Sequence, residues 1–210
     1  MSSLMKKIFL YHLQVTFLTI SLLILYGVSG MQASAQDRLE LSPESAVTID
    51  GDSNQSEWTV VVDSLYGWLE FVEGESGNPD VSGFELHVLS EEIVSNRSII
   101  MDRLMYRALK TSEFEEIVYE LTLAELVAIE GAPADTFALA TTGNLSIAGI
   151  THEITTTIGG EALQDGSYHF AGSYPMKMTD YGMRPPTALF GALHTRDDVI
   201  VNFDFTVRRD

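Results

Sequence analysis

Beyond Ser42, apolar residues recur at every second position along most of the chain. Successive side chains of a strand point to opposite faces, so this period predicts strands with one buried face. The alternating runs are residues 58–62, 84–88, 117–123, 137–141, 145–147, 154–158, 168–178 and 199–207. We therefore expect about eight or nine strands.

Glycine, proline and aspartate separate these runs at residues 50–52, 74–79, 131–133, 159–160 and 165–166. Such clusters are typical of turns. Many short strands at close spacing favour a sandwich or a barrel over alternating strands and helices. The pattern thus predicts an all-β fold without a second domain.

One segment, residues 98–109, has a helical period instead. Its apolar residues form a single stripe at spacings of three and four: Ile100, Met101, Leu104, Met105, Ala108 and Leu109. Ser98 or Asn96 is suited to cap the start. A single short amphipathic helix in a β protein is expected to lie on the sheet or to close one end of a barrel.

The first 35 residues have the pattern of an export signal. Lys6 and Lys7 precede an apolar stretch over residues 8–28, and Ala-Ser-Ala at residues 33–35 is a small-x-small cleavage pattern. We expect residues 1–35 to be a signal peptide cleaved before Gln36, and residues 36–210 to be one exported domain, periplasmic or secreted. An uncleaved membrane anchor is the alternative, because the apolar run approaches the length of a span.

The charge is strongly acidic. All 30 acidic residues follow residue 36, with 10 of the 12 lysines and arginines, so the expected mature chain has a net charge of −20. This balance repels phosphate backbones and anionic membrane surfaces, and it argues against nucleic acid as a partner. The sequence contains no cysteine, which excludes disulfides, thiolate metal sites and a lipid anchor on an N-terminal cysteine.

Four stretches resemble the YceI-like family of polyisoprenoid-binding proteins. They are residues 47–58, with Val-Thr-Ile-Asp-Gly-Asp-Ser leading to Glu-Trp; the helix and its hinge at 101–110; residues 143–151; and residues 178–191. The order and spacing of these stretches resemble the family over roughly residues 41–207. The chain departs from the family at residues 65–77, which are unusually acidic, and at Ser56, where relatives often have a His-Asp-Trp run. The resemblance implies an eight-stranded antiparallel lipocalin-like barrel that holds an elongated apolar ligand, often an isoprenoid quinone or polyprenyl lipid.

The candidate ligand-binding residues are the inward alternates of several strands and the helix stripe. They are Trp58, Phe84, Leu104, Met105, Tyr119, Phe137, Phe170, Tyr174, Met176 and Met178. The inner face becomes small at Gly143, Gly149 and Gly172, which we expect to leave room for a lipid chain. Methionine adapts well to irregular apolar ligands, although ordinary core packing is the alternative for each one.

Cations are scarce, so their positions suggest where an anionic head group would bind. Arg103, Arg107 and Lys110 lie on or just after the helix, and Lys177 and Arg184 flank residues 180–181. Arginine pairs with phosphate through two hydrogen bonds. The alternative is that these cations only balance the acidic surface.

Catalytic motifs are weak in this sequence. It has neither a G-x-S-x-G nucleophile elbow nor a phosphate-binding G-x-x-x-x-G-K-[ST] loop. His194 with Asp197 and Asp198 could ligate a metal, and His152 with Glu153 could act as a general base, but we assign both groups to turns. We expect neither a cofactor nor a metal.

The sequence therefore predicts a non-enzymatic protein that binds, transports or stores an isoprenoid-like lipid in the cell envelope, without stable membrane insertion after cleavage. The first alternative is an exported interaction protein with a filled barrel core and no lipid. An enzyme is the second alternative and depends only on the histidine groups.

Overall fold

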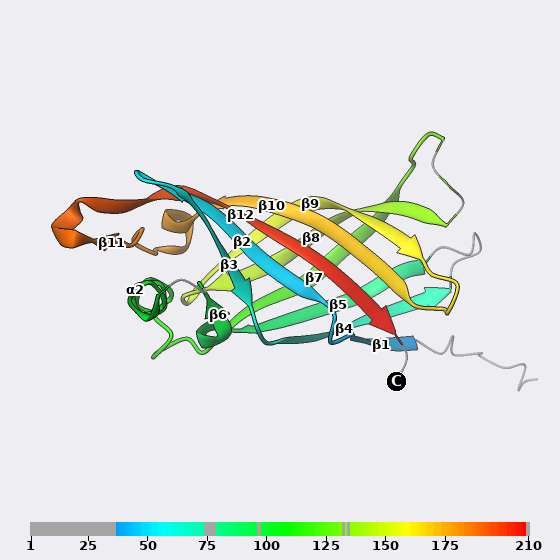
Figure 1. Ribbon diagram of the computed structural model, residues 1–210. Coiled ribbons are helices and arrows are strands. Elements are labelled where there is room, and N and C mark those ends of the chain that lie inside the picture. The colour runs from blue at the N-terminus through cyan, green and yellow to red at the C-terminus, as the bar shows by residue number, and fades with distance from the viewer. Residues whose placement is uncertain (1–36, 74–78, 96–97, 132, 134, 209–210) are drawn as a thin grey trace, which may run out of the picture. The chain divides into compact units, whose positions relative to one another are not determined.

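Twelve strands form one antiparallel sheet that closes on itself (Figure 1). They are β1 (Asp37–Leu41), β2 (Ala46–Ser53), β3 (Glu57–Val62), β4 (Leu65–Glu73), β5 (Pro79–Leu89), β6 (Ile93–Val94), β7 (Glu116–Val127), β8 (Thr136–Ile147), β9 (Ile150–Ala162), β10 (Tyr168–Lys177), β11 (Thr187–Ala188) and β12 (Leu193–Arg208). One α-helix, α2 (Ile99–Leu109), and three short 3₁₀ turns, η1 (Ser90–Glu92), η2 (Met178–Tyr181) and η3 (Leu189–Gly191), complete the fold.

The computed structural model describes residues 37–73, 79–95, 98–131, 133 and 135–208. The expected signal peptide and its cleavage site lie outside this part of the chain. No helix within it is long and apolar enough to cross a membrane.

Short breaks divide three of the barrel strands. β1 and β2 together form one long bent strand, and β3 and β4 form the next, because β1 pairs with β4 and β2 pairs with β3. β6 pairs with β3 and so extends the strand that β5 begins. β12 closes the ring, because it pairs with β10 on one edge and with β2 and β1 on the other. Counted in this way, the fold is the expected eight-stranded antiparallel barrel with one helix.

Alternation along each strand separates the core from the surface. On β8, Phe137, Leu139 and Thr141 are buried, and on β12, Val199, Phe205 and Val207 are buried while Asp204 between them is exposed. In a closed barrel the buried face is the interior.

Several boundaries differ from those that the sequence suggested. Residues 50–52 belong to β2, residues 159–160 belong to β9, and residues 137–147 form a single strand. Gly51, Gly143 and Gly160 lie against aromatic rings of the barrel interior instead of forming turns. β10 ends at Lys177, so Met178 begins η2 instead of continuing the strand. The turn at residues 165–166 is confirmed, and Asp165 accepts hydrogen bonds from the backbone and hydroxyl of Ser167.

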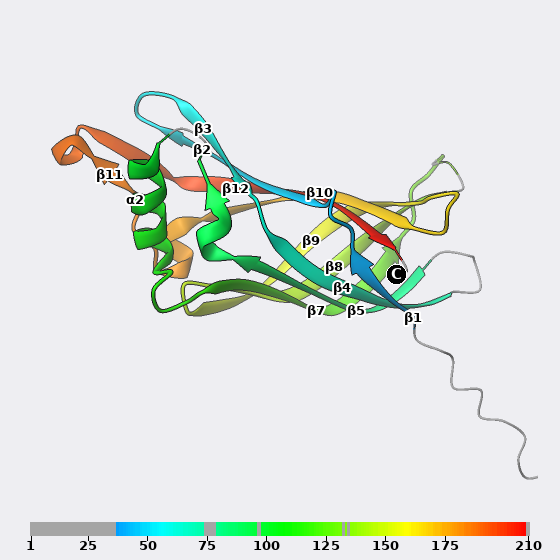
Figure 2. The same cartoon turned by 60° about the horizontal axis from the view of Figure 1, so that its bottom comes forward.

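Helix α2 lies at one end of the barrel in both views (Figures 1 and 2). Ser98 caps it as expected, since its hydroxyl accepts a hydrogen bond from the Ile100 amide at 3.2 Å. The carboxylate of Asp102 accepts hydrogen bonds from the amide and hydroxyl of Ser95, and the Tyr106 hydroxyl donates to the Glu91 carbonyl at 2.7 Å. These bonds attach the helix to the segment that follows β5.

Aromatic rings fill the barrel at the other end. The Phe71 and Tyr168 rings pack edge to face at 5.3 Å, and Phe137 packs edge to face on Tyr168 at 6.5 Å and on Phe170 at 5.8 Å. Leu39 and Val207, which are fully buried, belong to the same core. This end of the barrel is therefore closed.

Candidate functional site

The barrel encloses a cavity of about 430 Å³. Its lining follows β10 from Phe170 to Met176, a distance of about 20 Å along the strand at about 3.4 Å per residue. Met101, Met105, Ala108 and Leu109 of α2 line the end next to the helix, which we call the mouth. The cavity is thus elongated, with its mouth at α2.

The lining is apolar and carries no ionisable charge at neutral pH. None of the described lining residues is an aspartate, glutamate, lysine, arginine or histidine. Two phenols are present, and burial raises the pKa of both Tyr119 and Tyr174, which keeps them neutral. A charged group inside would be desolvated without a counter-ion, so the cavity suits an apolar ligand.

Eight of the ten candidate residues line the cavity: Trp58, Phe84, Met105, Tyr119, Phe170, Tyr174, Met176 and Met178. They come from β3, β5, α2, β7, β10 and η2. The structure therefore brings together side chains that lie far apart in the sequence.

Leu104 and Phe137 are not among the lining residues. Leu104 is half-buried, but the helix turns by about 100° per residue, so the adjacent Met105 faces the cavity instead. Phe137 is buried in the aromatic cluster at the closed end. Alternation and helical period define a face but not its position along the barrel, which is why these two residues lie outside the lining.

The expected role of the glycines also needs correction, because aromatic rings fill the space beside them. A Cβ atom on Gly172 would lie 2.6 Å from Cζ of Phe203, one on Gly143 would lie 2.5 Å from the Tyr119 ring, and one on Gly149 would lie 2.3 Å from the Phe114 ring. Gly172 and Phe203 are direct cross-strand partners. Gly143 and Gly172 thus make room for the rings of Tyr119 and Phe203, which line the cavity, whereas Gly149 lies in the β8–β9 turn against Phe114.

We expect Gly172→Val to reduce the ligand capacity of the cavity. The new side chain would push the Phe203 ring into the lumen, and overpacking of this kind costs about 1–3 kcal/mol. Chemical denaturation and a lipid-loading assay would measure both effects. The matched control is Ser173→Val, at an exposed position next to Gly172 on β10. Gly166 is unsuitable as a control because its φ is positive. Equal loading of the two variants would contradict this role of the glycine.

Residues that sequence reasoning missed complete the lining. β12 contributes Val199, Val201, Phe203 and Phe205. The alternation that predicted this strand could have identified all four. Met101 was recognised only as part of the helix stripe, and Met183 lies in an irregular segment after η2, where no periodic pattern marks it.

None of the five candidate head-group cations lines the cavity. Lys177 forms an ion pair with Asp198 at 2.7 Å, and Lys110 donates to the Ala148 carbonyl at 3.5 Å. Arg103, Arg107 and Arg184 are exposed, and none takes part in the ion pairs observed within the described residues. Contact with a ligand head group therefore stays a prediction.

Side chains of both candidate histidine groups take part in local hydrogen bonds. His152 lies within β9 rather than in a turn, its Nε2 is 3.0 Å from the Asp180 carbonyl oxygen, and its ring packs edge to face on Tyr181. Asp197 accepts hydrogen bonds from Thr179, while Asp198 pairs with Lys177. In the described part of the chain no group of three or more potential ligands is arranged to hold a metal ion.

A separate polar cluster lies on the outer wall, over β4, β5 and β7. The imidazole of His87 bonds to Glu85 through Nε2 and to Glu116 through Nδ1, at 2.8 Å for the latter. It stacks on Tyr66 at 4.7 Å, and the Tyr66 hydroxyl donates to Glu116. Burial opposes the charged imidazole, but the bonds to both carboxylates outweigh it and raise the pKa of His87 above 6.5.

This cluster makes a pH-dependent contribution to stability. Because the folded state raises the pKa of His87, its contribution is complete below about pH 6.5 and is lost as the pH rises through the folded pKa. Hydrogen bonds from Tyr66 and His87 lower the pKa of Glu116, so its contribution is lost as the pH falls through that lowered value.

We therefore expect the difference in Tm between wild type and His87→Gln to be largest in mildly acidic solution and to shrink toward alkaline pH. Thermal denaturation over a pH series measures it. His169→Gln is the comparison variant, because this more exposed histidine pairs with Asp204 alone. A difference that grows with rising pH would contradict the assignment.

Comparison with known proteins identifies the family. The model of the YceI-like domain matches residues 44–207, so the chain belongs to this family. No curated protein sequence matches the chain. Several solved structures share the fold, among them the following three. A polyisoprenoid-binding domain from Saccharophagus degradans has a TM-score of 0.64 at 13% identity, covering 83% of this chain and 99% of its own.

The second is BcnA from Burkholderia cenocepacia, with a TM-score of 0.59 at 13% identity, covering 79% of this chain and 97% of that one. The third is a YceI protein from Campylobacter jejuni, with a TM-score of 0.53 at 13% identity, covering 72% and 85%. At such low identity these likenesses establish the fold alone.

Proposed function

We propose that this protein binds a single elongated apolar lipid of the isoprenoid type inside the barrel. The observation that carries the proposal is the uncharged cavity of about 430 Å³. Residues of α2 line it at one end, and aromatic rings close the other end. The Saccharophagus degradans relative, a polyisoprenoid-binding domain of the same fold, supports this class of ligand.

Burial energies favour a long chain over a small apolar molecule. Each buried CH₂ group contributes about 0.8 kcal/mol, whereas association itself costs about 4–15 kcal/mol. A chain of roughly twelve carbons or more is needed before burial exceeds a mid-range association cost of about 9.5 kcal/mol. The length of the cavity along β10 fits such a ligand better than a compact one.

The role that we propose is that of a carrier or store in the cell envelope, without catalysis. The pattern at residues 1–35, which resembles an export signal, supports the location. The cavity distinguishes this function from that of an interaction protein with a filled core. No acidic, basic or imidazole side chain is among the described lining residues, and burial keeps the two tyrosines of the lining neutral, which supports a binding role.

Fluorescence of Trp58 tests the proposal, because this indole lines the cavity whereas Trp68 does not. In a Trp68→Phe background, titration with decylubiquinone is expected to quench the remaining tryptophan saturably, and farnesol is expected to compete. An unquenched Trp58, or quenching that farnesol leaves unchanged, would contradict binding inside the barrel.

A further inference from the structure

A short hairpin beside the mouth carries two large apolar side chains that face solvent. Residues 187–192, which we call the apolar tip, connect β11 to β12 through η3. Leu189 is 71% exposed and Phe190 is fully exposed, at 113% of its reference area. Burying a leucine or a phenylalanine stabilises a protein by about 1.5–3 kcal/mol each, so the fold gives up a substantial gain here.

The backbone at the tip adopts left-handed conformations that residues with side chains rarely take. Leu189, Phe190 and Gly191 all have positive φ, of 51°, 54° and 89°. Left-handed backbone at a residue other than glycine costs about 1–3 kcal/mol and gathers at functional sites. Strain and exposure therefore coincide at the same two residues.

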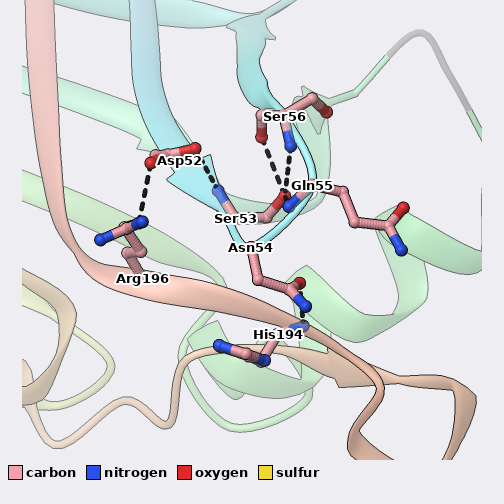
Figure 3. Close-up of polar contacts among 7 residues, drawn as sticks. All are labelled: Asp52, Ser53, Asn54, Gln55, Ser56, His194 and Arg196. Carbon is pink, nitrogen blue, oxygen red and sulfur yellow. Dashed lines mark hydrogen bonds and ion pairs between the residues drawn. The ribbon is translucent and has the colours of Figure 1, made fainter.

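Hydrogen bonds to the β2–β3 turn hold the base of the tip in place (Figure 3). The Asn54 side chain donates to the Ala192 carbonyl at 2.8 Å and accepts from the His194 amide at 3.1 Å. Nearby, Arg196 forms an ion pair with Asp52 at 2.8 Å. The base of the tip is thus held in place, because Asn54 bonds to both Ala192 and His194.

A second exposed apolar pair lies at the same end of the barrel. Ile99 and Ile100, at the start of α2, are 66% and 63% exposed. In both views α2 and β11 occupy the end away from β1 (Figures 1 and 2).

This apolar surface continues into the cavity. Pro186 and Leu193, which flank the tip, are lining residues, and so is Met101, which directly follows Ile100. An apolar molecule that enters between the tip and the helix would meet mainly apolar side chains, together with Ser53, Gln55 and Thr195, which are polar lining residues. The exposed arginines Arg103 and Arg107 lie on this helix, and Arg184 precedes the tip.

We propose that the apolar tip and the start of α2 dock the mouth of the barrel onto a lipid surface, which would load or unload the ligand. This inference rests on the proposed function. Leu189, Phe190, Ile99 and Ile100 insert among the acyl chains, and the three arginines face head-group phosphates, as in interfacial binding generally. A lipid surface fits better than a protein partner, because a water-insoluble ligand then passes from membrane to cavity without crossing water.

Flotation with phosphatidylcholine vesicles tests this docking. These vesicles offer phosphates without the net negative charge that the acidic chain would repel. We expect wild type to float with the vesicles, and the double variant Leu189→Ser/Phe190→Ser to bind roughly a hundredfold more weakly or worse, since two inserted side chains are lost.

The matched control removes two exposed apolar side chains from the opposite end of the barrel. Leu126 and Ile129, at the β7–β8 connection, are 49% and 48% exposed, and Leu126→Ser/Ile129→Ser is expected to float like wild type. Wild type that fails to float, or a control variant that loses as much binding as the tip variant, would overturn the docking proposal. Vesicle-independent self-association through the tip would overturn it in favour of a protein partner.

Decylubiquinone quenching of Trp58 separates this proposal from the proposed function. The tip residues do not line the cavity, so the tip variant is expected to bind soluble quinone with wild-type affinity. Absence of quenching in wild type contradicts the lipid-binding function itself, whereas normal quenching without flotation contradicts only the docking.

Discussion

We expect Ile158→Asp to abolish lipid loading, while Thr157→Asp leaves it unchanged. The two residues are neighbours on β9, but Ile158 lines the cavity and Thr157 is exposed on the outer wall. A carboxylate at residue 158 has no counter-ion among the described lining residues, so it must be desolvated against the lipid. At a cost of about 3 kcal/mol, affinity falls roughly a hundredfold.

The measurement is the amount of lipid recovered from each purified variant. Circular dichroism must show that Ile158→Asp is folded, since a buried charge also destabilises the barrel. Ile158→Trp provides an uncharged second variant, because its larger ring occupies space that the ligand needs. Wild-type lipid loads in both folded Ile158 variants would show that the ligand binds elsewhere.

The second large effect is expected at the closed end. Phe137→Ala should lower the free energy of unfolding by about 3–5 kcal/mol, because it removes a buried ring that packs on Tyr168 and Phe170. Since Phe137 lies outside the lining, the folded variant is expected to retain lipid.

Urea denaturation measures this change. Val127→Ala, at an exposed position on the neighbouring strand β7, is the control and is expected to change stability by no more than about 0.5 kcal/mol. A loss for Phe137→Ala as small as that of Val127→Ala, or a folded variant without lipid, would contradict the assignment of Phe137 to the closed end.

The sequence predicted the barrel well, because its strands have one buried and one exposed face. The run from Val199 to Val207 forms β12 with its expected inner face, and Ser98 caps α2 as expected. β1, β2 and β4 were not found by alternation. In β4, Trp68 is half-exposed beneath the guanidinium of Arg38 on the outer wall, so the simple apolar-inward pattern is blurred.

Positions along the barrel axis could not be predicted, because they depend on strand register. The same inward alternation places Phe170 on the cavity and Phe137 in the closed end. The exposed tip was also missed, since Leu189 and Phe190 resemble ordinary core residues in a linear sequence. Their exposure is seen only in the folded structure, where their backbone is left-handed.

Mass spectrometry of an organic extract of the native protein tests the central claim most directly. The protein, purified without detergent from the organism that makes it, is expected to release an isoprenoid-like lipid in stoichiometric amount, and the Ile158→Asp variant prepared in parallel is expected to release none. An extract of folded wild-type protein that contains no lipid, or the same amount from both proteins, would contradict a ligand-binding barrel.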